Sequence, residues 1–394
     1  MTRVLRSHPP ELSAIQAPVR DSLDRVGDEI KRIVLSDFSN IEEVNEHLLF
    51  MRGKLFRPTL LLLASRLEGE AAQDDALTPA AVVELVHLAT LVHDDAVDHS
   101  ALRRGLPTVN ALWTHQVAII MGDYLYSRGV AELARVGRLE ALAVLANAAN
   151  EMSVGEMRQL TSYDALDFSE EDYYRLIAAK TASLMAAACE MGSLVGAPRY
   201  REPLARYGHN LGMAFQIADD LLDYTGNEAV TGKPTGHDLR ERKVTLPLVG
   251  ALQRATPAEE REIRAFFTLA DPADEDIARI VSIVAARGGL AYAQMLKKAV
   301  AGIRNWVTDY NDLSKWALRQ HAERMNMGRL TCVRSTLVTL LAVAIAAGCT
   351  SRSPEAQLIQ DAADAVGGAD RILAVHTLTL EGAGSNGSLG QGFL

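Results

Sequence analysis

Two clusters of aspartate are the residues of this sequence best suited to chemistry. They are Asp94-Asp95-x-x-Asp98 and Asp219-Asp220-x-x-Asp223, and each ends an apolar run. The outer acids of each cluster are at i and i+4, so on a helix both carboxylates project from one face. If the two helices face each other, the carboxylates form an all-oxygen site for Mg²⁺, which also takes water and phosphate oxygens as ligands. The clusters therefore indicate a metal site for a diphosphate substrate.

A solvated acidic face is the alternative interpretation of either cluster taken alone. Both clusters, however, lie within apolar segments, where an unpaired charge is costly to bury. The occurrence of two copies favours the metal site.

A diphosphate also needs positive charge, and the sequence places cations beside both clusters. Lys54 and Arg57 are at i and i+3 next to Pro58, which favours a helix start suited to phosphate oxygens. An ordinary basic helix start is the alternative there, and a single lysine elsewhere is more often a surface charge. The other candidates are Arg103 and Arg104 after the first cluster, Lys180 with Thr181 inside an apolar segment, and Lys233 and Lys243 after the second cluster.

Three further polar residues lie in apolar surroundings close to the acids. His87 precedes the first cluster on the same predicted helix, His93 adjoins Asp94, and Gln216 precedes the second cluster. Each has two interpretations of equal weight. It either holds substrate or a carboxylate, or it is a packed and hydrogen-bonded residue of the core.

The positioning elements are predicted to be helices. Long segments rich in Ala, Leu and Val repeat their apolar residues with a period of 3.6, and no alternating strand pattern competes before about residue 370. The fold class is therefore all-α, a large helical bundle whose site is built from inward-facing side chains. Examples of predicted helices are Pro58 to Leu67, Pro79 to Val92, Val117 to Val136, Leu139 to Gln159, Glu170 to Val195 and Pro203 to Tyr224.

Composition limits the partners and the compartment. The chain of 394 residues has 48% hydrophobic residues and a net charge of −10, which argues against nucleic acid as a partner. Its three cysteines form no CxxC pattern, no secretory signal is found at the N-terminus, and a cytoplasmic location is expected.

The residues from 327 to 394 break the helical pattern. A basic stretch up to Arg334 is followed by the apolar run Leu337 to Ile345 and by small residues ending in Cys349, an order similar to a bacterial lipoprotein signal. The division predicted is a catalytic domain at 1–326 and a fused, unrelated tail at 327–394. A buried last helix of the bundle is the alternative, and membrane association through residues 335–349 is a further expectation.

Together these motifs resemble the trans-type polyprenyl (isoprenyl) diphosphate synthases. The resemblance extends from about residue 20 to 300, and its motifs occur in the order of the family. The end departs from the pattern, because the last helices of the family are hard to recognise in Asn305 to Arg324. The matching motifs are Gly53-Lys54-x-x-Arg57-Pro58, His87, Asp94-Asp95-x-x-Asp98, Arg103-Arg104-Gly105, Gly122-Asp123-Tyr124-Leu125, Gly155-Glu156-x-x-Gln159, Lys180-Thr181, Phe215-Gln216-x-x-Asp219-Asp220-x-x-Asp223 and Gly232-Lys233.

The resemblance implies an isoprenoid synthase bundle around a central cavity that joins isopentenyl diphosphate to an allylic diphosphate. It implies Mg²⁺, for which Mn²⁺ can substitute, on Asp94, Asp95, Asp98, Asp219 and Asp223. Catalytic roles fall to Asp94, Asp98, Lys180, Asp219 and Gln216. Substrate binding falls to Lys54, Arg57, His87, Arg103, Arg104, Lys180, Thr181, Gln216 and Lys233.

The resemblance also implies the length of the product and the oligomeric state. Ala89 and Thr90, just before the first cluster, correspond to the chain-length pocket; neither is aromatic, so a medium- or long-chain product is expected. A homodimer is implied, and membrane contact is expected through the product or the C-terminal apolar segment.

Three other functions are weighed. A terpene cyclase shares the architecture and the first acidic motif but needs no isopentenyl site. A phosphohydrolase using His93 and Asp94 as metal ligands would leave the second cluster idle. The third alternative is a non-catalytic subunit of a heteromeric prenyl synthase.

Overall fold

The computed structural model describes residues 12–51, 53–69, 74–161, 165–225, 235–269 and 271–301. By its internal contacts the chain divides into two units, residues 1–325 and 326–394. All the described residues lie in the first unit. The lipoprotein-like segment, its apolar run and Asn305 to Arg324 therefore lie outside the described residues. Within the described ranges, no helix combines the length and the apolarity needed to cross a bilayer.

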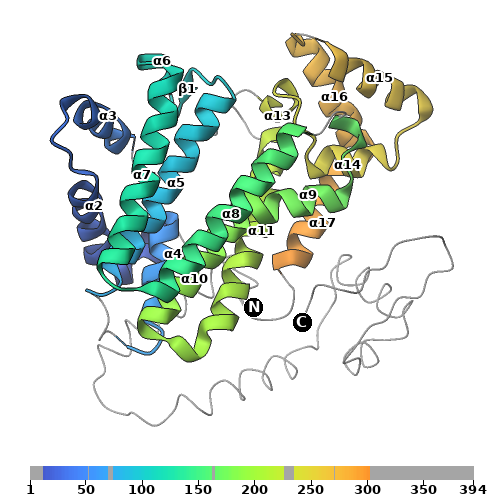
Figure 1. The fold of residues 1–394 in the computed structure, drawn as a ribbon. Coiled ribbons are helices and arrows are strands. Elements are labelled where there is room, and N and C mark those ends of the chain that lie inside the picture. The colour runs from blue at the N-terminus through green and yellow to red at the C-terminus, as the bar shows by residue number, and fades with distance from the viewer. Residues whose placement is uncertain are drawn as a thin grey trace, which may run out of the picture. The chain divides into compact units, whose positions relative to one another are not determined.

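The described chain is a succession of helices, so the predicted all-α class is confirmed (Figure 1). Short 3-10 turns occur at Ala17–Val19, Ala165–Asp167 and Pro198–Tyr200, and a π-helical turn occupies Ala178–Ala182. The α-helices are α1 (Leu12–Gln16), α2 (Arg20–Val34), α3 (Ser39–Phe50), α4 (Phe56–Ser65), α5 (Leu77–Val97), α6 (Val109–Leu112), α7 (His115–Arg135), α8 (Leu139–Thr161), α9 (Glu170–Ile177), α10 (Ser183–Gly196), α11 (Arg201–Thr225), α13 (His237–Arg240), α14 (Leu246–Leu252), α15 (Pro257–Thr268), α16 (Asp274–Ala286) and α17 (Gly289–Ala301).

The predicted helices form close to their predicted ends, with one difference that matters for the site. Helix α5 runs past the predicted end at Val92, to Val97, and so carries the first acid cluster in its last turn. The amide of Asp98 donates to the carbonyl of Asp94 at 2.8 Å, which continues the helical pattern to the last acid. The i and i+4 relation assumed for this cluster is therefore real.

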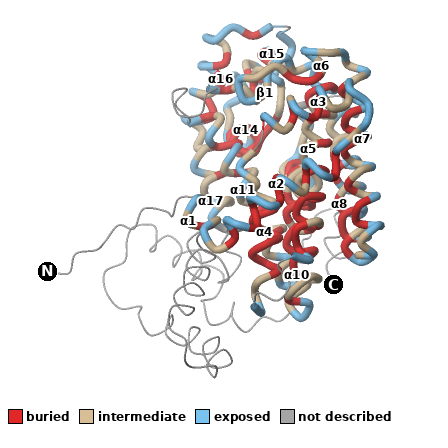
Figure 2. Tube along the Cα trace, turned by 90° about the vertical axis from the view of Figure 1, so that its left-hand side faces the viewer, coloured by how far each residue is buried: buried red, intermediate tan, exposed pale blue. Residues whose placement is uncertain are grey.

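The main hydrophobic core lies where α2, α4, α5, α7, α8 and α10 meet. Helix α4 is buried on all sides from Pro58 to Ser65, and Figure 2 shows this run beside buried parts of α2 and α10. Close contact between α4 and α10 depends on glycine: a Cβ at Gly196 would lie 1.8 Å from the Ser65 carbonyl oxygen. Two smaller cores join α9, α11 and α17, and α14, α15 and α16.

The described residues contain one β-hairpin, which the sequence pattern does not predict. Strands β1 (Leu102–Arg103) and β2 (Leu106–Pro107) pair antiparallel after α5. Arg104 and Gly105 form the turn with φ of 52° and 76°, the positive values of a type I′ turn. Strands of two residues are too short to show alternation, so the sequence pattern gives no sign of them.

An ion-pair network ties α2, α5 and α7 together. Arg32 on α2 contacts both Glu29, at 2.8 Å, and Glu132 on α7. Glu132 is also paired with Arg135 at 2.7 Å, and Glu29 accepts a hydrogen bond of 2.6 Å from Thr78 on α5. Hydrogen bonds from Arg135 and Arg32 outweigh the effect of burial and lower the pKa of Glu132 below 4.5.

We expect Glu132→Gln to lower the free energy of unfolding by about 1 kcal/mol at pH 7, since both arginines are largely exposed. The folded pKa of Glu132 is depressed, so its contribution is complete above the unfolded pKa and is lost as pH falls through the folded pKa. Urea unfolding of wild type and variant between pH 7 and pH 3 checks this. The two curves should converge at the acid end, and a constant difference would contradict the assignment.

Candidate active site

The three carboxylates of the first acid cluster differ in burial and in partners. Asp95 is buried, and Arg103 of the hairpin donates to both of its oxygens at 2.8 and 2.9 Å. Asp94 is half-buried and Asp98 is exposed at the end of α5. Burial raises the pKa of Asp94 to about 6, with Lys180 opposing the shift. Asp95 therefore holds the hairpin, while Asp94 and Asp98 remain on the accessible side.

The three carboxylates of the second cluster, on α11, also differ in burial and in partners. Asp220 is buried and accepts hydrogen bonds from the Tyr173 hydroxyl at 2.6 Å and the Gln216 amide at 2.9 Å. Asp223 caps α13, because its two oxygens accept the backbone amides of His237 and Asp238 at 3.1 Å each. Asp219 is exposed. One acid of this cluster faces solvent, and two are occupied in positioning neighbouring elements.

Lys180 and Thr181 lie in the π-helical turn between α9 and α10, where the sequence shows polar residues interrupting an apolar helix. Lys180 is paired with Glu156 on α8 and donates to Gln159 at 3.1 Å. Thr181 donates to the Gln216 side chain on α11 at 2.8 Å. π-Helical turns are rare and occur frequently at functional sites.

Glycine lets both flanking helices approach this π-helical turn. A Cβ at Gly155 on α8 would lie 2.7 Å from the Cβ of Ala179. A Cβ at Gly212 on α11 would lie 2.5 Å from the Cα of Ala182. The turn is therefore held between α8 and α11.

Two lysines interact electrostatically with carboxylates in or near the acid clusters. Lys180, held against α8 and α11, lowers the pKa of Asp94 on α5. Burial lowers the pKa of Lys243. Its hydrogen bond to Glu241 and the charges of Asp98 and Asp238 together raise the pKa by more than burial lowers it, so the net shift is upward. Lys243 is thus attracted by Asp98 of the first cluster and by Asp238 on α13, the helix that Asp223 caps. That the two clusters share one site stays a prediction from their duplication.

The donor set fits a metal that is only partly held by protein. Among the described residues, no three acidic, histidine or cysteine side chains converge closely enough to hold a metal ion by themselves. Mg²⁺ is commonly held by one or two carboxylates, with water and substrate phosphates completing its shell. Asp94, Asp98 and Asp219 are the accessible carboxylates of the clusters, and one or two of them for each metal ion would match that mode of binding.

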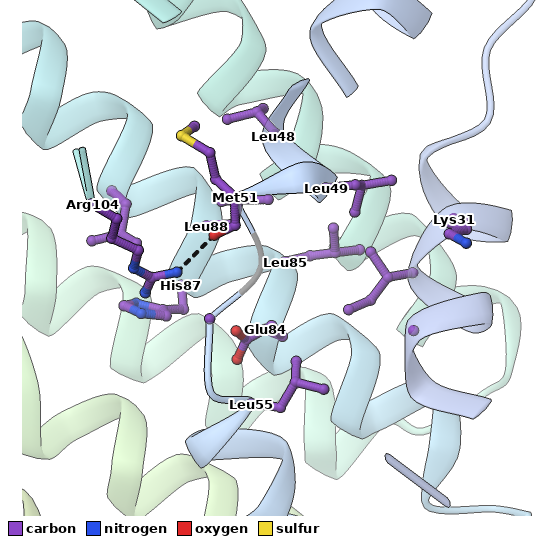
Figure 3. Close-up of a pocket in the computed structure, with 14 residues that line it drawn as sticks. Lys31, Leu48, Leu49, Met51, Leu55, Glu84, Leu85, His87, Leu88 and Arg104 are labelled. Carbon is purple, nitrogen blue, oxygen red and sulfur yellow. Dashed lines mark hydrogen bonds between the residues drawn. The ribbon is translucent and has the colours of Figure 1, made fainter. Parts of the chain in front are cut away.

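A separate pocket lies at the start of α4 and the middle of α5, and its charged lining residues are Lys31, Arg104 and the acidic Glu84 (Figure 3). We call it the cationic pocket, for Arg104 in its lining and for Arg57, whose charge acts on the lining residue His87. Burial lowers the pKa of His87 well below its ordinary value, and the charges of Arg57, Arg104 and Arg103 lower it further. His87 is therefore neutral at pH 7. Burial also lowers the pKa of Arg57, with the charge of Glu84 opposing the shift, and the Arg57 Nε is enclosed without a hydrogen-bond partner among the described residues. An enclosed, unsatisfied guanidinium nitrogen points to an anionic ligand.

Arg104 reaches this pocket from the hairpin turn. It donates to the carbonyl of Met51 at 2.7 Å, the bond dashed in Figure 3. A Cβ at Gly53 would lie 3.0 Å from the Arg104 guanidinium, so glycine leaves room for it. The other wall is apolar and includes Ile30, Leu48, Leu85 and Leu88.

The loop that carries Lys54 is fixed from both sides. Gln16 on α1 donates to the carbonyl of Lys54 at 2.8 Å, and Leu55 adopts a left-handed φ of 50° just before α4. Phe56 stacks on Phe215 of α11 at 5.7 Å between ring centroids. This contact places the cationic motif beside the residue that precedes Gln216.

The remaining candidate residues from the sequence lie in several different surroundings. The His93 side chain is 37% exposed and covers Gly122 on α7, and its Nε2 lies 3.0 Å from the Ile119 carbonyl and 3.4 Å from an Asp123 carboxylate oxygen. Ala89 is 2% exposed within the main core, and Thr90 donates to the His87 carbonyl at 2.8 Å. Lys233 lies outside the described residues. Sequence reasoning gave no individual role here to Glu156, Gln159, Tyr173 and Asp238, and the Gly155-Glu156-x-x-Gln159 motif was the available signal for the first two.

A helical bundle with two aspartate clusters and a cationic pocket on one of the same helices defines an enzyme of the isoprenoid synthase type. Residues 38–284 match the family model described as Polyprenyl synthetase. Among relatives, heptaprenyl diphosphate synthase component 2 of Geobacillus stearothermophilus is 38% identical over 70% of this chain and 84% of its own. Octaprenyl diphosphate synthase of Escherichia coli is 39% identical over 58% of this chain and 71% of its own.

Solved structures agree. The polyprenyl synthase of Caulobacter crescentus, complexed with calcium and isoprenyl diphosphate, matches with a TM-score of 0.70 and 33% identity over 80% of this chain and 93% of that one. The decaprenyl diphosphate synthase of Rhodobacter capsulatus matches with a TM-score of 0.70 and 35% identity over 79% and 93%. This chain belongs to the polyprenyl synthetase family. It is a prenyltransferase that makes polyprenyl diphosphates, as the sequence motifs predict.

Proposed function

We propose that the enzyme condenses isopentenyl diphosphate with an allylic diphosphate, in a reaction dependent on Mg²⁺ or on Mn²⁺ in its place, and releases a medium- or long-chain product. The observation that supports this is a pair of anion sites on one helix. Helix α5 carries His87 of the cationic pocket and Asp94 of the acid cluster at i and i+7, on one face. Two diphosphates can thus be held side by side, one by cations and one through metal.

The allylic diphosphate is assigned to the acid clusters. Asp94, Asp98 and Asp219 would hold the metal, with Asp95 and Asp223 supporting them through the hairpin and α13. When bound, Mg²⁺ supplies Lewis-acid neutralisation of the leaving pyrophosphate. Arg103, Lys180 and Lys233 add positive charge where the pyrophosphate leaves, and Thr181 and Gln216 place Lys180 beside it.

The isopentenyl diphosphate is assigned to Lys54, Arg57, His87 and Arg104. His87 is neutral, so it contributes a hydrogen bond to the diphosphate rather than another positive charge. The bond between the allylic carbon and its diphosphate oxygen breaks, and the C4 alkene of isopentenyl diphosphate forms the new carbon–carbon bond. The departed pyrophosphate takes the proton that is then lost, so no protein base is required.

One assay tests the proposal: purified protein, Mg²⁺, labelled isopentenyl diphosphate and a panel of allylic diphosphates, with products sized by chromatography. Incorporation of label into longer prenyl diphosphates is the expected result. Cyclised hydrocarbon without uptake of isopentenyl diphosphate would overturn it in favour of a terpene cyclase.

A second candidate is a subunit that requires a partner, favoured by the relative named as component 2 of a heptaprenyl synthase. Against this we propose a cytoplasmic homodimer that contacts the membrane through its product. Light scattering gives the mass of the purified protein. Inactivity that is restored only by a second protein would establish the heteromeric form.

Ala89→Phe is expected to shorten the main product by several isoprene units. Ala89 and Thr90 are one turn before Asp94, and a bulky side chain there would obstruct a growing chain that extends between the helices. Product sizing by chromatography checks the shift. Because Ala89 is 2% exposed, Thr90→Phe on the half-buried neighbour serves as a second variant that disturbs the core less. Wild-type product lengths in both folded variants would refute the pocket assignment.

A further inference from the structure

Three consecutive hydrogen bonds run from a buried tyrosine to the π-helical turn. The Tyr173 hydroxyl on α9 donates to Asp220 at 2.6 Å. Gln216 donates to the other oxygen of Asp220 at 2.9 Å, and Thr181 donates to the carbonyl oxygen of the Gln216 side chain at 2.8 Å. We call this chain of four residues the tyrosine relay. It links α9, α11 and the residue next to Lys180.

Burial and hydrogen-bonding chemistry fix the orientation of the Gln216 side-chain amide within the tyrosine relay. Tyr173 is 1% exposed and Asp220 4% exposed, so water does not compete for their bond. The Asp220 carboxylate only accepts hydrogen bonds, which obliges Gln216 to turn its NH₂ toward it. The carbonyl oxygen of Gln216 then faces Thr181. Removing the tyrosine hydroxyl would leave Asp220 with one donor fewer and loosen this orientation.

The π-helical turn depends on such side-chain contacts, because its backbone leaves the regular α-helical hydrogen-bond pattern. Its described side-chain bonds are to α8, through Glu156 and Gln159, and to α11, through Gln216. The first pair touches Lys180 itself, while the relay fixes the turn against the helix that carries Asp219.

We propose that Tyr173 is a positioning residue for prenyl transfer, acting through Asp220, Gln216 and Thr181 to set the placement of Lys180 relative to Asp219. The inference rests on the proposed function, in which Lys180 and the metal held by Asp219 act on the same leaving pyrophosphate. Tyr173 itself is enclosed in the core and does not touch substrate.

The test compares Tyr173→Phe with Tyr174→Phe. The neighbouring tyrosine bonds to Glu170 outside the relay, so its variant is a matched loss of one hydroxyl. We expect Tyr173→Phe to lower kcat roughly tenfold, because small misplacements of catalytic groups are costly. The KM for isopentenyl diphosphate should change less than about twofold, since the cationic pocket is separate. Tyr174→Phe should match wild type in both, and an unchanged kcat in Tyr173→Phe would overturn the proposal.

A double-mutant cycle separates positioning from general loosening. If Tyr173 acts through Thr181, then Tyr173→Phe should have little further effect on kcat once Thr181→Val has broken the relay. Additive effects of the two substitutions on kcat would overturn the proposal.

Hydrogen exchange of residues 178–182 provides a readout that needs no substrate. Faster exchange in Tyr173→Phe than in Tyr174→Phe is expected, and equal exchange would overturn the relay. If wild-type protein failed to elongate any primer, the proposed function would fail while this comparison still tested the relay.

Discussion

Asp94→Asn and Asp219→Asn are each expected to lower kcat by about a thousandfold or more while leaving the fold intact. Both acids are among the accessible ones of their clusters, and neither is fully buried. Asparagine keeps the shape but removes the negative charge that a divalent metal requires. The metal then neutralises the departing pyrophosphate less well, and the loss falls on the chemical step.

Steady-state kinetics with labelled isopentenyl diphosphate, over a range of Mg²⁺ concentrations, measures this effect. Asp24→Asn on α2 is a matched control, because Asp24 is exposed and lies outside both clusters. It should behave as wild type. Full activity in either cluster variant, at the same Mg²⁺ requirement, would show that the acids do not hold the metal.

Arg57→Met is expected to reduce kcat/KM for isopentenyl diphosphate by about a hundredfold, with the KM of the allylic substrate unchanged, since charge-assisted contacts to phosphate are strong. Methionine retains an apolar chain of similar length and removes the guanidinium. Burial of the Arg57 guanidinium opposes folding, and its Nε lacks a described hydrogen-bond partner, but the charge of Glu84 favours the buried cation. Arg57→Met removes this attraction, so the variant should be somewhat less stable than wild type without substrate.

Two measurements check this prediction: initial rates with each substrate varied in turn, and thermal unfolding of the substrate-free protein. Arg57→Lys keeps the charge but loses the planar fork, so its rate should lie between wild type and Arg57→Met. Equal increases in both KM values would contradict a site for one substrate only. A variant more stable than wild type would contradict the stabilising attraction between Arg57 and Glu84.

Helical periodicity predicts most of the described fold because the bundle is built from long amphipathic segments. Helices α7, α8 and α11 begin and end within a few residues of their predicted positions. The hairpin at Leu102–Pro107 is missed because its two strands are too short for any pattern, and its turn places an arginine where glycine or asparagine is usual.

The residue types of the candidate site could be predicted from the sequence, but the separate role of each residue could not. Spacing places Asp94 and Asp98 on one face, but six aspartates look alike in sequence. Their different roles come from partners that the spacing does not specify, such as Arg103 of the hairpin for Asp95 and Tyr173, 47 residues away, for Asp220. Glu156 was given no individual role for the same reason, since its contact with Lys180 joins two helices.

The bond between Arg104 and the Met51 carbonyl has a consequence for affinity. The guanidinium has five N–H donors, so the bond to Met51 uses one of them and leaves the others for phosphate oxygens. A side chain already held by the main chain loses less rotamer freedom when a substrate binds. Arg104 is therefore oriented in advance for each of the repeated additions, every one of which brings a fresh five-carbon unit to the same side chain.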